Sequence, residues 1–365
     1  MINLRRVTSS NEYFPFIDGL RFVSIIAVVL VHFVDFYAAH TYEVDKTPTY
    51  DQWHLKYAFG SSENSILLFF AISGFILGMP FAKRYLAKES YPKLRNFYIR
   101  RLTRLEPPYL LVLTGLFLLN VFIIHRDTFM NTLPHYLASF FYLHNIVYEA
   151  HPTLNFVFWS LEIEVQFYLL APFFARIFKL EMVTRRVLLV SGILFFGILN
   201  QYYHPPFLSL FNFFHFFLAG FLALDLFLNN RFKKHYAFDL ACLVLVMLIY
   251  TGLVEYSVLI CFMIAALIYF SSLSIIWEKF LQFKWVSIIG GMCYSIYMLH
   301  QPAMAVFFNR FFGNDMIGNS LWLDFGARLL MTLTLVLTLS AVFFVLVERP
   351  CMKREWYKRF LPRSK

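Results

Sequence analysis

The stretch FIDGLRFVSIIAVVLVHF, residues 16–33, decides the fold class. It lies within an apolar run over residues 14–38, which is long enough for the roughly 20-residue helix that crosses a bilayer core. Its exceptions are Asp18, Arg21 and His32, and an ionisable group at membrane depth costs at least about 2.5 kcal/mol on insertion scales. The stretch therefore predicts a transmembrane helix whose ionisable groups serve a site.

The whole chain has the composition of an integral membrane protein. Of its 365 residues, 59% are hydrophobic and only 15% are charged, and the mean hydropathy is +0.61. Soluble domains carry about 25% charged residues. We predict one all-α, polytopic membrane domain over residues 1–365 with about ten transmembrane helices. The predicted spans lie near residues 14–38, 62–82, 105–125, 153–178, 187–203, 207–228, 237–254, 256–276, 286–311 and 322–347.

The positive charge is distributed as in a membrane protein. With the N-terminus inside, 26 of the 32 Lys and Arg residues fall in cytoplasmic segments, including a basic tail at 348–365. The positive-inside rule then places both termini in the cytoplasm. The net charge of +10 is explained by this topology, and no nucleic-acid partner is expected.

Neither a leader peptide nor a metal site is expected. No small-residue cleavage site follows the first span, which should stay in the mature protein. The histidines and cysteines lack metal-ligand spacing, so no metal is assigned. Free thiols are predicted at all four cysteines, Cys242, Cys261, Cys293 and Cys351.

Arg21 and His32 are expected on one face of the first span and, if both serve a site, in one common water-accessible cavity. Eleven positions correspond to about 1100° of helical rotation and a rise of about 16 Å. Two interpretations stay open for each residue: Arg21 either pairs with Asp18 at the interface or serves a site, and His32 either packs or serves a site. Asp35 either orients the His32 imidazole or lies at the outer interface.

Two further groups of polar residues stand out. In FYIRRLTRLEPPYLL, residues 97–111, Arg101 and Arg104 point the same way on a helix and either bind one polyanion or fix the topology. In WSLEIEVQFYLLAP, residues 159–172, Glu162 and Glu164 lie on roughly opposite sides of a helix. At most one of these two carboxylates faces a given cavity, unless both lie at the outer end of the helix.

Other segments carry weaker signals. Ser73 and Gly74 indicate a close contact between helices. The segment CYSIYMLHQP, residues 293–302, places several polar groups in one span, where they either pack or line a site; they are Tyr294, Ser295, Tyr297 and His300.

Together these segments resemble the integral membrane acyltransferase-3 family, bacterial proteins that move acyl groups, usually acetyl, onto cell-surface carbohydrate. The family patterns appear in order as Arg21 with His32, Ser73–Phe75, Arg101 with Arg104, Trp159–Glu164, Tyr294–His300 and Glu348–Pro350. Position 162 is usually small in the family and is Glu here, so Glu164 inherits the carboxylate role. The resemblance is to the form without an extracytoplasmic esterase-like domain.

The resemblance implies an O-acetyltransferase of the bacterial inner membrane that uses cytoplasmic acetyl-CoA. It implies donor binding by Arg21, Arg101 and Arg104, and catalysis by His32 with Glu164 and Asp35. Substrate or oxyanion contacts are then expected from Ser160, Trp159, Tyr294, His300 and Glu162. The resemblance leaves open whether transfer is direct or passes through an acyl-histidine intermediate. The expected acceptor is a lipopolysaccharide O-antigen or an exopolysaccharide, met through histidines of the loops 39–61 and 126–152, namely His40, His54, His125, His135, His144 and His151.

Three alternatives stay open. Intramembrane His, Asp, Glu and Arg residues also suit a secondary transporter or flippase of a polysaccharide precursor. An acyltransferase that acts on a small glycoside would carry the same motifs. A non-catalytic partner in a polysaccharide export complex is the third.

Overall fold

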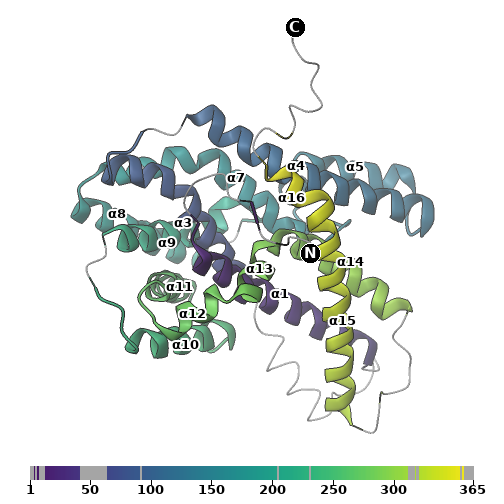
Figure 1. The fold of residues 1–365 in the computed structure, drawn as a ribbon. Helices are drawn as coiled ribbons and strands as arrows, with labels where there is room; N and C mark the ends of the chain where they lie inside the picture. Colours follow the sequence, from purple (N-terminus) through teal and green to yellow (C-terminus); the bar gives the residue numbers. More distant parts are fainter. Residues whose placement is uncertain are drawn as a thin grey trace.

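A computed structural model describes residues 4, 6–7, 13–41, 64–90, 93–203, 205–229, 232–310, 317, 320–353 and 356. Helices make up most of these residues, and none of them is in a strand (Figure 1). The predicted all-α class is confirmed. His54 and most of the predicted tail at 348–365 lie outside the described residues.

Six helices in the described ranges are long and apolar enough to cross a membrane. They are α1 (Pro15–Thr41), α3 (Ser65–Leu86), α4 (Leu94–Leu118) with η1 (Leu119–Ile123), α8 (Met182–Tyr202), α9 (Leu210–Leu228), and α15 (Leu321–Phe343) with η3 (Phe344–Glu348) and α16 (Arg349–Cys351). A seventh span arises if α11 (Ser257–Ser271) and α12 (Ile276–Gln282), bent by 86°, are counted together. The chain is thus a multi-pass membrane protein.

The predicted count of ten spans is not reproduced by this length and composition test. The fourth predicted span corresponds to α7 (Phe158–Phe174) followed by the 3-10 helix η2 (Ala175–Lys179). The seventh predicted span corresponds to the 14-residue α10 (Ala237–Tyr250). The ninth is divided at Met292 into α13 (Lys284–Gly291) and α14 (Cys293–Arg310). An apolar run in sequence does not reveal where the chain changes direction. The cytoplasmic placement of both termini stays a prediction.

The predicted close contact at Gly74 is confirmed. Helices α3 and α9 cross there, and a Cβ at Gly74 would lie 2.3 Å from the Phe217 carbonyl oxygen. On the facing helix, a Cβ at Gly220 would lie 2.0 Å from the Ala71 carbonyl oxygen. Glycine at both positions lets the two backbones approach, as small residues do in membrane helix pairs.

The substitution Gly220→Ala is expected to destabilise the folded protein by about 1–3 kcal/mol, the usual cost of overpacking. The reason is that the added methyl group meets backbone, which cannot move as a side chain can. Thermal unfolding in detergent measures the effect. Gly115→Ala on α4 is the matched control, because a Cβ there meets nothing within 4 Å. An equal loss of stability in both variants would contradict the packing argument.

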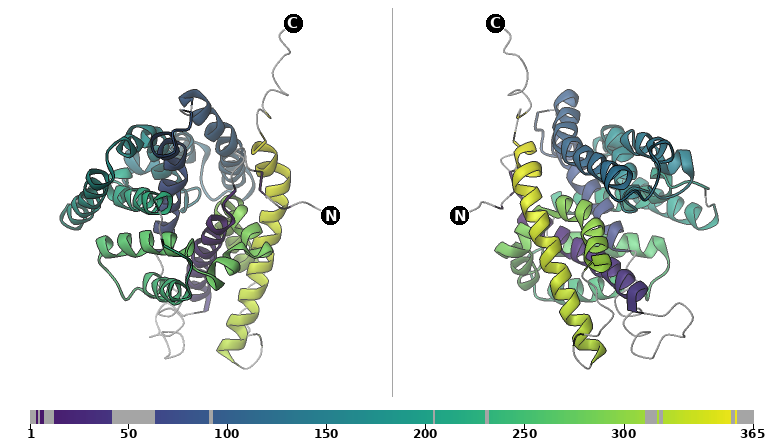
Figure 2. Two further views of the ribbon diagram at one scale, coloured as in Figure 1. Left: turned by 60° about the vertical axis from the view of Figure 1, so that its left-hand side comes forward. Right: turned by 90° about the vertical axis from the view of Figure 1, so that its right-hand side faces the viewer.

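The site is framed by α1, α3, α4, α7 and α14, and α15 runs beside it. The long α15 is visible along one edge of the molecule in Figure 2. At its end Glu348, which is 1% exposed, accepts a hydrogen bond of 3.1 Å from the backbone N–H of Ser295 on α14. The remaining helices, α5 (Phe129–Phe140) and α6 (His144–Tyr148), pack near α4 and α7.

Candidate active site

A central cavity of about 880 Å³ lies between these helices. Its lining includes six residues to which the family resemblance assigned a role in donor binding, catalysis or substrate contact, namely Arg21, Arg101, Arg104, Ser160, Glu164 and Tyr294. They come from α1, α4, α7 and α14, which are far apart in the chain. The fold therefore assembles one site from several of the motifs.

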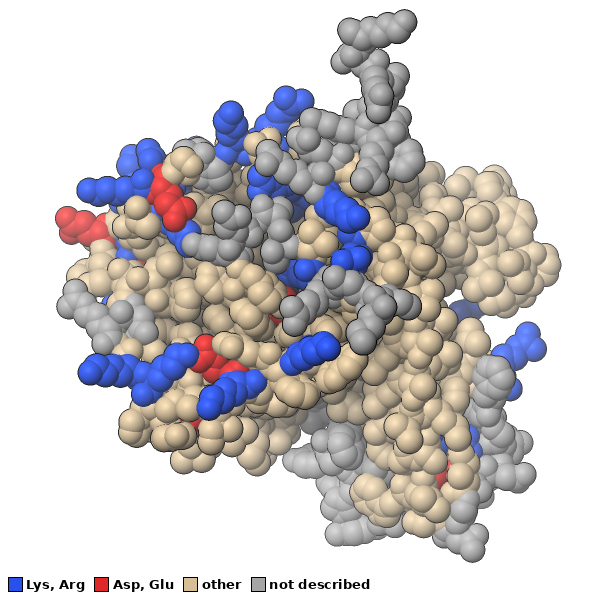
Figure 3. All heavy atoms as spheres, viewed as in Figure 1, with Lys and Arg blue, Asp and Glu red and all other residues tan. Residues whose placement is uncertain are grey.

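The lining of the central cavity is strongly cationic. Nine Lys and Arg residues line it against three acidic residues, Asp18, Glu89 and Glu164. Lys and Arg also outnumber Asp and Glu on the face of the molecule in Figure 3. The cations are Arg6, Arg21, Lys83, Lys93, Arg95, Arg100, Arg101, Arg104 and Lys353. Such a lining favours a polyanionic ligand.

Asp18 is the centre of an ion-pair cluster in the wall. Its Oδ1 accepts hydrogen bonds from Arg21 at 2.7 Å and from Arg6 at 2.9 Å. The Asp18–Arg21 pair expected for an interfacial cation is present, and Arg21 lines the central cavity as well. Sequence reasoning missed Arg6, which lies twelve residues from Asp18 and belongs to no motif.

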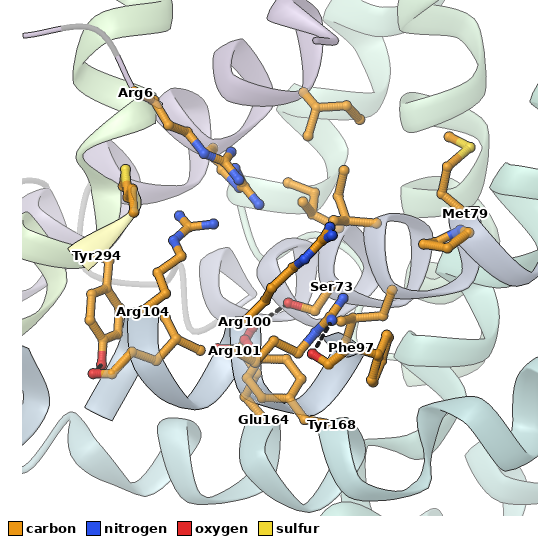
Figure 4. A pocket seen from close by; sticks show the side chains of 18 of the residues that line it. Arg6, Ser73, Met79, Phe97, Arg100, Arg101, Arg104, Glu164, Tyr168 and Tyr294 are labelled. Carbon is orange, nitrogen blue, oxygen red and sulfur yellow. Dashed lines mark hydrogen bonds between the residues drawn. The ribbon is translucent and has the colours of Figure 1, made fainter. Parts of the chain in front are cut away.

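The cluster holds more positive than negative charge. Burial, with the nearby Arg104 and Arg21 cations, lowers the pKa of Arg6 to about 10. Buried polar atoms with no hydrogen-bond partner among the described residues include Nε of Arg6, Nε of Arg104 and Oδ2 of Asp18. In Figure 4, Arg6 and Arg104 approach the cavity from different sides. Uncompensated cations and free N–H groups together fit an anionic ligand.

Arg101 and Arg104 lie one turn apart on α4, as predicted. Arg101 donates to the Phe97 carbonyl oxygen at 2.9 Å, and its guanidinium carbon lies 3.6 Å from the centre of the Phe97 ring. These contacts hold Arg101 against the helix, whereas Arg104 keeps a free Nε. Two cations with different degrees of restraint thus line the same wall.

The two carboxylates of α7 face different surroundings. Glu164 lines the central cavity and accepts a hydrogen bond from the Ser73 hydroxyl of α3 (Figure 4). Glu162 is fully buried and accepts from the backbone N–H groups of His144 at 3.2 Å and Asn145 at 2.9 Å. The prediction that only one carboxylate faces a given cavity is confirmed. Glu162 anchors the start of α6 and does not line the central cavity.

His32 does not line the central cavity, so the expectation that Arg21 and His32 share one cavity is wrong. Ser160 and Tyr297 line the cavity, whereas His32 lies beside His300, which does not line it, with ring centres 5.3 Å apart. Helical periodicity placed Arg21 and His32 on one face of a helix, but it carries no information about which side chains of other helices line the cavity. His32 Nδ1 lies 3.8 Å from Oδ2 of the exposed Asp35.

His300 is fully buried and has a defined hydrogen-bonding role. Its Nδ1 lies 3.1 Å from the Ile296 carbonyl oxygen, which only accepts, so Nδ1 carries a proton. In the neutral ring Nε2 is then an acceptor, and it has no partner among the described residues. Neutral His300 therefore suits a hydroxyl group that donates, not an oxyanion.

Trp159 packs beside this region. Its ring lies 5.3 Å from Phe213 and 5.8 Å from His151, and it is absent from the cavity lining. The exposed His151 lies 4.3 Å from Phe156, whose ring is 6.3 Å from His32. Aromatic rings thus connect His32 with the surface on the side away from the central cavity.

A smaller cavity of about 240 Å³ lies near α5. Its lining is polar, with Asn120, Arg126, Asp127, Thr132, His135, Thr153 and Leu154. Next to it, His135 Nδ1 is 2.9 Å from His144 Nε2. His40 contacts its own helix through the Phe36 carbonyl oxygen, and His125 belongs to neither cavity. Among the described residues, no three His, Cys, Asp or Glu side chains could hold a metal ion.

Comparison with protein families matches the chain to an acyltransferase domain over residues 14–347. This chain belongs to the acyltransferase-3 family. The match runs from the start of α1 to nearly the end of η3. It therefore covers the helices that build the central cavity. Arg6 and the last residues of that lining, Cys351 to Lys353, lie outside the matched range.

Relatives within the acyltransferase-3 family are named for O-acetyl transfer. The chain is 28% identical over 211 residues to the peptidoglycan O-acetyltransferase OatA of Listeria monocytogenes, covering 54% of this chain and 30% of that protein. It is 26% identical over 196 residues to putative O-acetyltransferases of Staphylococcus aureus strains COL and MSSA476, covering 51% of this chain and 28% of each. The chain thus matches less than a third of the length of these relatives. No solved structure matches it.

Proposed function

We propose that the protein is an O-acetyltransferase of the bacterial inner membrane. It transfers acetyl from cytoplasmic acetyl-CoA to a hydroxyl group of a surface carbohydrate. The observation that carries this proposal is the cationic central cavity, which holds the family's arginines and Glu164 together. The names of the relatives support acetyl as the group transferred.

Coenzyme A fits the cavity through its phosphates. Arg101 and Arg104 bind the phosphates in charge-assisted contacts, and the Arg21–Arg6 cluster supplies further positive charge. The pantetheine arm then extends toward Ser160, where the cavity ends. This arrangement brings the thioester to the wall that separates the cavity from His32.

The transfer step needs a base for the acceptor hydroxyl. His32 takes the hydroxyl proton while the acceptor oxygen attacks the thioester carbonyl carbon. The tetrahedral intermediate collapses, the carbon–sulfur bond breaks, and the imidazolium returns the proton to the leaving thiolate. Asp35, whose Oδ2 lies 3.8 Å from Nδ1 of His32, orients the imidazole ring. Attack by His32 itself on the thioester gives the alternative acyl-histidine route.

Two hydroxyl groups are the candidates for oxyanion stabilisation at the thioester end of the cavity. The Tyr294 hydroxyl donates to the Leu105 carbonyl oxygen at 3.0 Å, and the Ser160 hydroxyl is 2.6 Å from the Tyr297 hydroxyl. Each hydroxyl therefore exchanges this contact for the oxyanion when the intermediate forms. Arg21 keeps further N–H donors beyond its bond with Asp18, and because it precedes His32 by about 16 Å along α1, these donors serve the phosphates of the coenzyme.

The acceptor approaches from the side opposite to the coenzyme. The aromatic path from His151 to His32 and the polar cavity beside His135 support a carbohydrate on that side. O-antigen, exopolysaccharide and, from the name of the Listeria relative, peptidoglycan are the candidate acceptors. Glu162 and Trp159 contribute by holding α6 and the loop that carries His151.

The experiment is to incubate the purified protein in proteoliposomes with acetyl-CoA labelled in the acetyl group and with isolated surface glycan. We expect alkali-labile label on the glycan and one coenzyme A released per acetyl transferred. A transporter or flippase would leave the thioester intact. Label on a small glycoside but not on polymer would favour that alternative, and label on the protein without acceptor would favour the acyl-histidine route.

A further inference from the structure

The end wall of the central cavity is built by Tyr297 of α14. Tyr297 and Ser160 both line the cavity, whereas His32 and His300 do not. Tyr297 is 6% exposed, and its ring lies 5.8 Å from that of His300. A single aromatic side chain therefore separates the space for the thioester from the histidine pair.

Hydrogen bonds hold this ring in place. The Tyr297 hydroxyl donates to the Val157 carbonyl oxygen at 2.8 Å and lies 2.6 Å from Ser160 Oγ. The Asn155 side-chain amide adds a bond of 3.0 Å to the Met298 carbonyl oxygen. These hydrogen bonds join α14 to the beginning of α7, and they hold the Tyr297 ring between the two helices.

The cavity is narrowed by aromatic rings at this end. Phe69 lies edge-on to Tyr297 with ring centres 6.4 Å apart, and both residues line the cavity. Since the rings face the place where an acyl group would lie, each methylene added to that group must displace one of them. Packed interiors resist such additions.

We propose that Tyr297 is the barrier between the coenzyme cavity and the His32–His300 pair, where it limits the acyl group to acetyl and keeps water from the thioester until the acceptor is bound. This inference rests on the proposed function and adds a specificity-determining residue to it. Tyr297 shifts when its bonds to Val157 and Ser160 break. The thioester carbonyl then faces His32.

The test compares acetyl-CoA with butyryl-CoA in purified Tyr297→Ala and Tyr297→Phe. In Tyr297→Ala the missing ring should raise the butyryl-to-acetyl ratio of coenzyme A release at least tenfold. In Tyr297→Phe the ring stays and the hydroxyl is lost. The ratio should therefore stay near that of the unmodified protein, while coenzyme A release without acceptor rises severalfold. In that release water attacks the thioester and gives free carboxylic acid and coenzyme A thiol, both measured by chromatography.

Tyr109→Phe is the matched control. Tyr109 is fully buried, donates to the Ser139 carbonyl oxygen at 2.8 Å, and does not line the central cavity. If Tyr297 had only a structural role, its variants would release coenzyme A more slowly from acetyl-CoA and butyryl-CoA by the same factor. The same would hold for a control variant that is only destabilised. An unchanged ratio in Tyr297→Ala together with unchanged acceptor-free release in folded Tyr297→Phe would overturn the barrier. Failure of the unmodified protein to consume acetyl-CoA would instead overturn the proposed function.

Discussion

His32→Ala is expected to lower acetyl transfer by about 10²- to 10⁴-fold, the range lost when a general base is removed. The protein should stay folded in the membrane, since His32 is partly exposed and makes ring contacts with His300 and Phe156 rather than buried polar bonds. Binding of coenzyme A should be retained because His32 does not line the central cavity. Initial rates with labelled acetyl-CoA and glycan measure the loss.

The control for this variant is His235→Ala. His235 is exposed, its Nδ1 accepts a hydrogen bond of 3.1 Å from the Ala237 backbone N–H, and it lines neither cavity. Transfer by His235→Ala should stay within about twofold of the unmodified protein, because surface changes usually cost little. Transfer by His32→Ala at a similar level would remove His32 from the chemistry and direct attention to the buried Nε2 of His300.

The double substitution of Arg101 and Arg104 by Ala is expected to raise KM for acetyl-CoA by about 10²-fold or more. Each charge-assisted hydrogen bond contributes about 1.5–3 kcal/mol, and each 1.4 kcal/mol is a factor of ten. The two contributions need not add, since both residues would bind one ligand. The rate at saturating coenzyme should change less, because the arginines lie on α4, away from His32.

Labelling of Cys293 gives an independent measure of coenzyme binding. Cys293 and Cys351 line the central cavity, while Cys242 and Cys261 are fully buried outside it, so the labelling is done with Cys351 replaced by Ser. Coenzyme A should protect Cys293 from maleimide in the parent protein and fail to do so in the double variant. Arg176→Ala is the control, since Arg176 is a cation outside the cavity lining. Full protection in a correctly inserted double variant would mean that the pair serves only the topology.

The sequence was sufficient for the parts of the site that depend on local periodicity. The spacing of Arg101 and Arg104 and the two-residue separation of Glu162 and Glu164 predicted which side chains share a face, and the structure agrees. The sequence was insufficient where a side chain from another helix determines the surroundings of two residues on one helix. Tyr297 comes from α14 and separates the surroundings of Arg21 and His32, which a single helix cannot reveal.

Two other differences between the sequence-based predictions and the structure also arise from tertiary structure. Arg6 joins the site through its ion pair with Asp18, and a lone arginine in a polar segment gives no sign of this contact. The predicted ninth span, residues 286–311, is one apolar run in the sequence. The structure divides this run at Met292 into α13 and α14.

The position of Arg6 and Trp356 has a practical consequence for handling the protein. Arg6 is bound to Asp18 in the cavity wall, and the Trp356 indole N–H donates to the Thr103 carbonyl oxygen at 2.9 Å on α4, between Arg101 and Arg104. Both residues lie outside the range 14–347 that matches the acyltransferase family. A shortened protein that keeps only the matched range would lose these two contacts with the walls of the cavity, so we expect it to bind acetyl-CoA more weakly than the full chain does.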